Sequence, residues 1–156
     1  MSTGHQSLSR TTQRGVAIVE FTITLPLMLL LIFVTAEFGR AFMQQNTLTK
    51  AVRDSVRHLA SEALLGQTGN VMIDANLQLA AQNLVVYGNV NGVGTAILPG
   101  LDIADVTAAP ALGVGDISLS ATYAYAPMFL VLPGFGLGPD TNPLFTLRAA
   151  STMRAL

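Results

Sequence analysis

Charge is scarce in this sequence, and cysteine and tryptophan are missing altogether. Only 11% of its 156 residues are charged, and the formal net charge is −1. Such a chain lacks the basic footprint that nucleic-acid binding requires, so we expect no nucleic-acid partner. The missing cysteine excludes disulfides, thiol catalysis and thiolate metal sites. It leaves the cellular compartment open, because exported proteins need not contain cysteine.

Catalytic groups are also sparse. The two histidines are His5, near the start, and His58, which lies four residues before Glu62 and fits a surface pair. No histidines have metal-ligand spacing, and no serine has a nearby His/Asp grouping. The dispersed carboxylates fit turns and helix caps; they are Asp74, Asp102, Asp105, Asp116 and Asp140. We therefore expect no enzyme activity, no metal, no cofactor and no small-molecule substrate.

What the chain does have is a long apolar run near its beginning. From Val16 to Ala36 the only charged residue is Glu20. Roughly 21 helical residues span the ~30 Å hydrocarbon core of a bilayer. Arg10 and Arg14 precede the run, and the polar leader before it, Met1 to Arg14, is typical of disordered targeting segments. The pattern predicts one transmembrane helix in contact with lipid.

Two residues inside this run are unusual. Glu20 is either an interfacial carboxylate or a paired charge: if the chain were cut after Gly15, the new amine of Val16 would lie one helical turn away. Pro26 cannot donate a backbone hydrogen bond to Thr22, which predicts a kink that Thr22 and Thr24 partly compensate.

Helical character continues after the apolar run. Apolar residues recur every three or four positions from Phe38 to Ala63, which predicts an amphipathic helix that ends near Leu65, before Gly66. Lys50, Arg53 and Arg57 share another face. That face is either solvated or in contact with lipid phosphates or a partner's acids.

The rest of the chain changes from helix to strand. Residues Val71 to Tyr87 predict a second helix, followed by a Gly/Asn-rich loop from Gly88 to Gly100, in which Asn91-Gly92 offers an alternative hairpin turn. Strict alternation predicts two strands, and a weaker one precedes them; the ranges are Ile117 to Tyr125, Phe145 to Arg154, and Leu101 to Thr107. Between the two strong strands, the apolar run Met128 to Leu132 fills the core or contacts membrane or a neighbouring subunit.

These elements predict an α+β fold: a long N-terminal transmembrane and stalk helix, a short second helix, and a small antiparallel sheet of about three strands. The sheet should pack on the stalk, burying Val52, Val56 and Leu59 against Leu119, Tyr123 and Leu147. The corresponding domains are a leader (1–15), a membrane helix (16–36), a stalk (37–66) and an α+β domain outside the cytoplasm (67–156).

The segment from Arg14 to Arg57 resembles the TadE/TadG-like family of the tight-adherence (Flp) pilus system. Gly15, Val16, Glu20 and Phe21 look like a type IV prepilin processing site, and the following motif runs through Glu37, Phe38, Gly39, Arg40, Arg53 and Arg57. The family usually has Glu-Gly-Ala where this chain has Asp54, Ser55 and Val56. Because Ser55 and Val56 are bulkier than Gly and Ala, we do not carry over a close helix contact there.

The resemblance implies a minor pseudopilin. A prepilin peptidase would cut after Gly15, and Glu20 would pair with a subunit's N-terminal amine during assembly. The implied partners are other pseudopilins and the inner-membrane assembly platform. The chain would sit in the bacterial inner membrane with its N-terminus cytoplasmic, although lysines and arginines on both sides of the span leave orientation open by charge alone.

Two other functions remain compatible with the residues. One is a secreted soluble protein cut near Ala36 by ordinary signal peptidase, where Val34-Thr35-Ala36 offers a small-residue site. The other is a single-pass membrane protein that keeps its leader as part of an uncut anchor.

Overall fold

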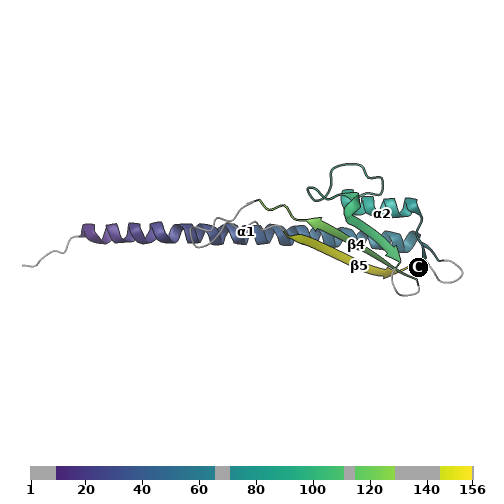
Figure 1. Cartoon of the computed structure of the whole chain (residues 1–156), viewed down its shortest axis with the longest axis horizontal. Coiled ribbons are helices and arrows are strands. Elements are labelled where there is room, and N and C mark those ends of the chain that lie inside the picture. The colour runs from purple at the N-terminus through teal and green to yellow at the C-terminus, as the bar shows by residue number, and fades with distance from the viewer. Residues whose placement is uncertain (1–9, 66–70, 111–114, 129–144, 156) are drawn as a thin grey trace, which may run out of the picture. The chain divides into compact units, whose positions relative to one another are not determined.

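The computed structural model describes residues 10–65, 71–110, 115–128 and 145–155. It divides the chain into two compact units, Met1–Phe38 and Gly39–Leu156. Helix α1 (Arg10–Glu62) supplies the described part of the first unit and the opening element of the second. The fold is α+β, as predicted, and Figure 1 shows its two helices and the strands of its sheet.

Helix α1 differs from its predicted bounds at both ends. It begins at Arg10, so the prediction of disorder was wrong for residues 10–14, and it stops at Glu62 rather than Leu65. No glycine or proline lies between Arg10 and Arg14. Extending an existing helix costs far less than nucleating one, so the apolar run carries these polar residues with it.

A small hairpin replaces helix at the next junction. Strand β1 (Leu64–Leu65) pairs antiparallel with β2 (Val71–Met72), in the register Leu64 to Met72 and Leu65 to Val71. Helix α2 therefore begins only at Ala75, after the extended residue Asp74, and ends at Tyr87. Gly88 closes it in the left-handed region, with φ 72°, a conformation that favours glycine.

The segment from Gly88 to Gly100 is a loop, as predicted, and the alternative hairpin at Asn91-Gly92 is wrong because Val85 and Val86 belong to α2. Side chains hold the loop. The Asn89 amide donates to the Val93 carbonyl (2.7 Å), while its oxygen accepts from the Val93 N–H (3.1 Å). Gly92 has φ 68°, and a Cβ there would lie 2.8 Å from the Asn83 side-chain oxygen, so only glycine fits.

Three antiparallel strands form the main sheet in the order β3-β4-β5. They are β3 (Val106–Pro110), β4 (Asp116–Ala124) and β5 (Thr146–Arg154). The two strong strands were predicted to within one residue at each end. The weaker one was misplaced, because a 3-10 turn (Ile103–Asp105) precedes β3 and is fixed by a capping box between Asp102 and Asp105.

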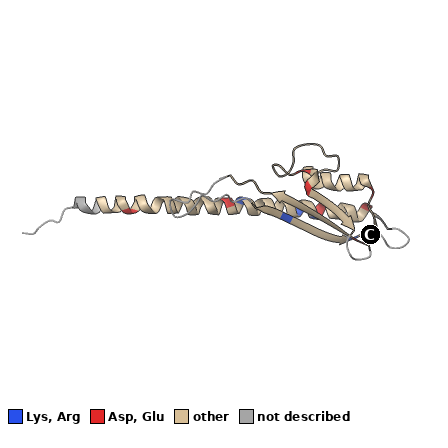
Figure 2. Ribbon diagram, viewed as in Figure 1, with Lys and Arg blue, Asp and Glu red and all other residues tan. Residues whose placement is uncertain are grey.

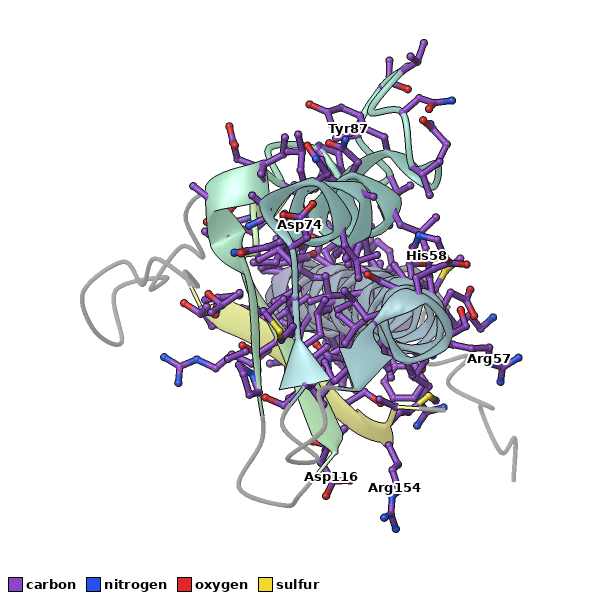
Figure 3. All side chains as sticks on the ribbon, turned by 90° about the vertical axis from the view of Figure 1, so that its right-hand side faces the viewer. Arg57, His58, Asp74, Tyr87, Asp116 and Arg154 are labelled. Atoms are coloured by element: carbon purple, nitrogen blue, oxygen red, sulfur yellow. The ribbon has the colours of Figure 1, made fainter. Side chains whose placement is uncertain are left out.

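The core of the second unit lies between α1, α2 and the sheet. Alternate residues of β4 are buried, with Ile117 and Leu119 fully enclosed and Tyr123 1% exposed. They join one cluster with residues of both helices, which confirms the predicted packing of sheet on stalk; the α1 members include Leu48, Val52, Val56 and Leu59. Figure 3 shows α2 and β5 on different sides of α1, while β3 lies against α2.

A glutamine from each helix donates a hydrogen bond to a backbone carbonyl of an outer strand of the sheet. Gln45 of α1 donates its amide N–H to the Arg148 carbonyl on β5, and Gln82 of α2 donates to the Val106 carbonyl on β3, both at 2.9 Å. Because β3 and β5 are the outer strands, these carbonyls would otherwise lack a ladder partner. Gln45, a polar residue within the otherwise apolar stripe of α1, thus has a structural role.

Candidate membrane and assembly helix

The first part of α1 exposes most of its apolar side chains. Val16, Ile23 and Leu27 are 67%, 70% and 69% exposed, and most other large apolar residues up to Phe33 are 39–65% exposed, whereas Leu30 and Val34 are half-buried. Among the described residues, α1 is the one helix long and apolar enough to cross a membrane, and none of its apolar window is buried. A helix that is apolar all round has no stable surface in water, so this segment fits a lipid environment.

Charge follows the opposite distribution. Figure 2 shows few charged residues along the first part of α1, while most of the described charges lie in the second unit. Glu20 is exposed and is followed by no further charge until Glu37. An exposed carboxylate on an apolar helix is costly in lipid unless it is paired or lies near the interface, so it points to a partner or a boundary.

Local packing does not explain why residue 15 is a glycine, Gly15. It lies inside α1, and a Cβ added there would meet no atom within 4 Å. Its backbone is helical, so the left-handed freedom of glycine is not used. Glycine in a helix costs roughly 0.5–1 kcal/mol relative to alanine. The folded chain would therefore be more stable with another residue, and the reason for this glycine lies outside the fold.

Helix α1 continues through Pro26. The hydroxyl of Thr22 donates to the Ile18 carbonyl (2.8 Å), and that of Thr24 donates to the carbonyl of Glu20 (3.0 Å). The carbonyl that Pro26 deprives of its usual donor is that of Thr22, so both hydroxyls serve carbonyls nearer the N-terminus. The expected compensation at Thr22 is therefore wrong. Each hydroxyl thus satisfies its own hydrogen-bonding capacity within the helix.

The residues of the motif from Glu37 to Arg40 differ in how far they are exposed. Phe38 is 72% exposed, and Gly39 has open space where a Cβ would be. Arg40 is half-buried, with its guanidinium 6.0 Å from the centre of the Tyr125 ring. Arg40, which belongs to the second unit, thus makes a cation–π contact within that unit.

Tyr125 continues that contact into the second unit. Its ring stacks on Phe145, with the ring centres 4.7 Å apart. Tyr125 follows β4 and Phe145 precedes β5, and the Tyr125 N–H donates to the Phe145 carbonyl (3.0 Å). Arg40 is therefore held against the end of the β4–β5 ladder.

The basic stripe faces outward. Lys50, Arg53 and Arg57 are all exposed, and Figure 3 shows Arg57 pointing away from the core. The solvated-face reading accounts for their exposure. The residues between them, above all Val52 and Val56, provide the buried face.

Ser55 makes a close helix contact, although none was carried over from the family. It is fully buried, and its hydroxyl donates to the carbonyl of Ala81 on α2 at 2.7 Å. Ala81 is also fully buried, so a small residue on each helix allows a close approach. The signal that could have identified this contact was the pair of small residues, Ser55 and Ala81, on the apolar faces of two predicted helices.

The buried environment of Tyr123 changes the affinity of its phenol for a proton. Burial raises its pKa above 10, partly offset by the positive charge of Arg40. Its hydroxyl donates to the Pro99 carbonyl at 2.9 Å, which fastens the loop before the 3-10 turn to the sheet. Within the described residues no three His, Asp or Glu side chains converge as metal ligands.

Comparison with protein families supports the resemblance. Residues 15–57 match the family model described as TadE-like protein. The matched segment contains the predicted processing-site and motif residues from Gly15 to Arg57. No curated protein and no solved structure matches the chain.

Proposed function

We propose that this chain is a minor pseudopilin of a tight-adherence pilus system, cut after Gly15 by a prepilin peptidase and used in pilus assembly. The observation that carries the proposal is that the family match begins at Gly15, a helical glycine whose position packing within the fold does not explain. A glycine required by a peptidase would be kept despite its cost to helix stability.

In this account Glu20 has a role that exists only after cleavage. The new amine at Val16 is a cation one helical turn from Glu20. That amine pairs with Glu20 of its own chain or of a neighbouring subunit, and pairing lowers the cost of a carboxylate in lipid. The partners are the peptidase, other pseudopilins, the inner-membrane assembly platform and the bilayer; the proposal assigns no catalytic step to the chain.

The account also gives an orientation. The leader faces the cytoplasm and the second unit lies outside it, in the periplasm. Basic residues flank both ends of the apolar run, so orientation follows from the processing site rather than from the charge distribution. Supporting pilus assembly in this position would contribute to surface adherence.

The test compares two carboxamide variants in the bacterium that makes the pilus. Glu20→Gln removes the charge that pairs with the amine, and we expect it to reduce pilus number about tenfold or more, since a charge pair in lipid is worth at least about 1.4 kcal/mol. Glu62→Gln, at the exposed end of α1, is the matched control and should leave pili unchanged.

A second pair of variants separates processing from assembly. Gly15→Leu should leave the leader attached and abolish assembly, whereas Gly39→Ala changes a helical glycine elsewhere in α1 and should be cut normally. Normal pili with Glu20→Gln, or normal cutting of Gly15→Leu, would contradict the proposal. A leader retained in the unaltered chain would favour an uncut anchor, and a chain starting near Glu37 would favour a secreted protein.

A further inference from the structure

The exposed face of α1 stays apolar beyond the end of the predicted span. Phe38, Phe42 and Met43 are 72%, 69% and 71% exposed, as much as the side chains inside the apolar run. Single exposed apolar residues are ordinary on protein surfaces. Three within two turns of one helix, directly after a membrane-length run, form a continuous surface that calls for an occupant.

Helical geometry places these residues on one side. At about 100° per residue, Phe38, Phe42 and Met43 fall within a sector of roughly 140°, and Gly39 lies inside it. The two charged residues of the same turns, Glu37 and Arg40, fall outside this sector and are half-buried. Arg40 is directed to the Tyr125 ring. The apolar sector is therefore free of charge through Met43.

The same sector becomes polar immediately afterwards. Asn46, Lys50 and Arg53 continue it along α1, and all three are exposed. The change from an apolar to a polar surface thus occurs between Met43 and Asn46, not at Ala36. A bilayer surface has such a boundary, because the environment changes from hydrocarbon to headgroups to water within a few ångströms.

The spacing between Glu20 and Arg40 indicates the same position of the membrane boundary along α1. Glu20 and Arg40 enclose about 19 residues, or roughly 28 Å of helix, close to the ~30 Å hydrocarbon core. With these two residues at the boundaries, Phe42 and Met43 lie about 3 to 5 Å further along the axis. That is within the headgroup layer, directly outside the hydrocarbon core.

We propose that Phe42 and Met43 lie in the outer interface of the bilayer, so that lipid contact along α1 extends from Glu20 to Met43. The occupant of this surface is the lipid interface. The inference rests on the membrane span within the proposed function and is independent of the pilus role. It places the first turn of the second unit at the membrane surface, with the polar sector starting at Asn46 in water.

The absence of tryptophan makes a direct test available. Single-tryptophan variants of the full chain are prepared in phosphatidylcholine vesicles that contain brominated lipids, which quench nearby indole fluorescence. Phe42→Trp probes the proposed interface. Leu31→Trp, at the centre of the span, reports insertion, and Met72→Trp, on β2, is a matched exposed control.

The bromine depth decides the outcome. We expect bromines near the headgroups to reduce Phe42→Trp fluorescence about twofold and bromines near the chain ends to have less effect, with the reverse order for Leu31→Trp. Met72→Trp should be unaffected by both. The side chains replaced are exposed, so the variants should fold; a cooperative unfolding transition for each confirms it.

The alternatives give different signals. Unquenched Phe42→Trp alongside quenched Leu31→Trp would overturn the inference: a red emission maximum would indicate water, and a blue maximum would indicate contact with a second copy of the chain. Loss of quenching at Leu31→Trp as well would mean that the span itself is wrong, and the membrane part of the proposed function would fail with it.

Discussion

Two consecutive segments of helix α1 differ in the exposure of their apolar side chains. Between Val16 and Phe33, α1 exposes most of its large apolar side chains, whereas between Leu48 and Leu59 its large apolar residues are 0–1% exposed. The amino-acid types are alike; the difference is that the second segment alternates with polar residues at helical spacing and the first does not. Local sequence makes both segments helical, and the surroundings of each segment decide what its apolar residues do.

The largest test of this difference places the same charge in both segments. Val56→Asp buries a carboxylate in the core of the second unit, where Val56 is fully enclosed, and should cost more than about 3 kcal/mol. We expect loss of the cooperative unfolding transition of that unit, followed by circular dichroism.

The matched change, Ile32→Asp, lies on the exposed segment, where Ile32 is 56% exposed. It should leave that transition in place and weaken membrane insertion instead, by about 2.5–3.5 kcal/mol. If Ile32→Asp unfolded the second unit, or if Val56→Asp were tolerated, the two segments would not differ as described.

A smaller effect is expected where α1 meets α2. Ser55→Leu adds volume where the Ser55 hydroxyl lies 2.7 Å from the Ala81 carbonyl, and overpacking of this kind costs roughly 1–3 kcal/mol. Ser55→Ala removes the hydrogen bond without adding volume and should cost about 1 kcal/mol. Chemical denaturation measures both, and equal costs for the two variants would argue against a close helix contact.

Alkaline pH tests the buried tyrosine. Burial raises the pKa of Tyr123 above 10, so the native state holds the phenol proton more tightly than the unfolded chain. The stability that follows is fully present below pH 10 and is lost as pH rises through the folded pKa. Tyr123→Phe should reduce this alkaline loss and, by removing the bond to Pro99, should cost about 1 kcal/mol at neutral pH. An unchanged alkaline profile in the variant would contradict the assignment.

The smallest effect is expected at Gly39. A Cβ there meets no atom within 4 Å, so Gly39→Ala should stabilise α1 by about 0.5–1 kcal/mol in the isolated chain. Thermal unfolding in detergent measures the gain. A loss of stability would mean that another part of the chain approaches this surface.

Much of the fold follows from periodicity, and the errors have physical causes. The strands β4 and β5 were predicted because strict alternation over nine residues has no helical equivalent. The hairpin of β1 and β2 was missed because strands of two residues carry no period at all. Residues 10–14 were wrongly expected to be disordered because their helix is an extension of the apolar run.

Some residues of the candidate site can likewise be recognised from the sequence, and others cannot. Glu20, Pro26 and Gly15 stand out from the sequence because each is unusual within an apolar helix. The contact of Arg40 with Tyr125 joins residues far apart in the chain, so no local pattern reveals it. The contact of Ser55 with Ala81 is also distant in sequence, and only the small size of the two residues on predicted apolar faces indicates it. Arg53 and Arg57 are exposed.

The most direct test of the central claim is the N-terminal sequence of the mature protein, purified from bacterial membranes and measured by mass spectrometry. The account predicts a start at Val16, one residue after Gly15. A start at Met1 would contradict processing and leave a plain membrane anchor. A start at Glu37 would remove Glu20 and the whole apolar run from the mature protein, and the proposed assembly role would fall with them.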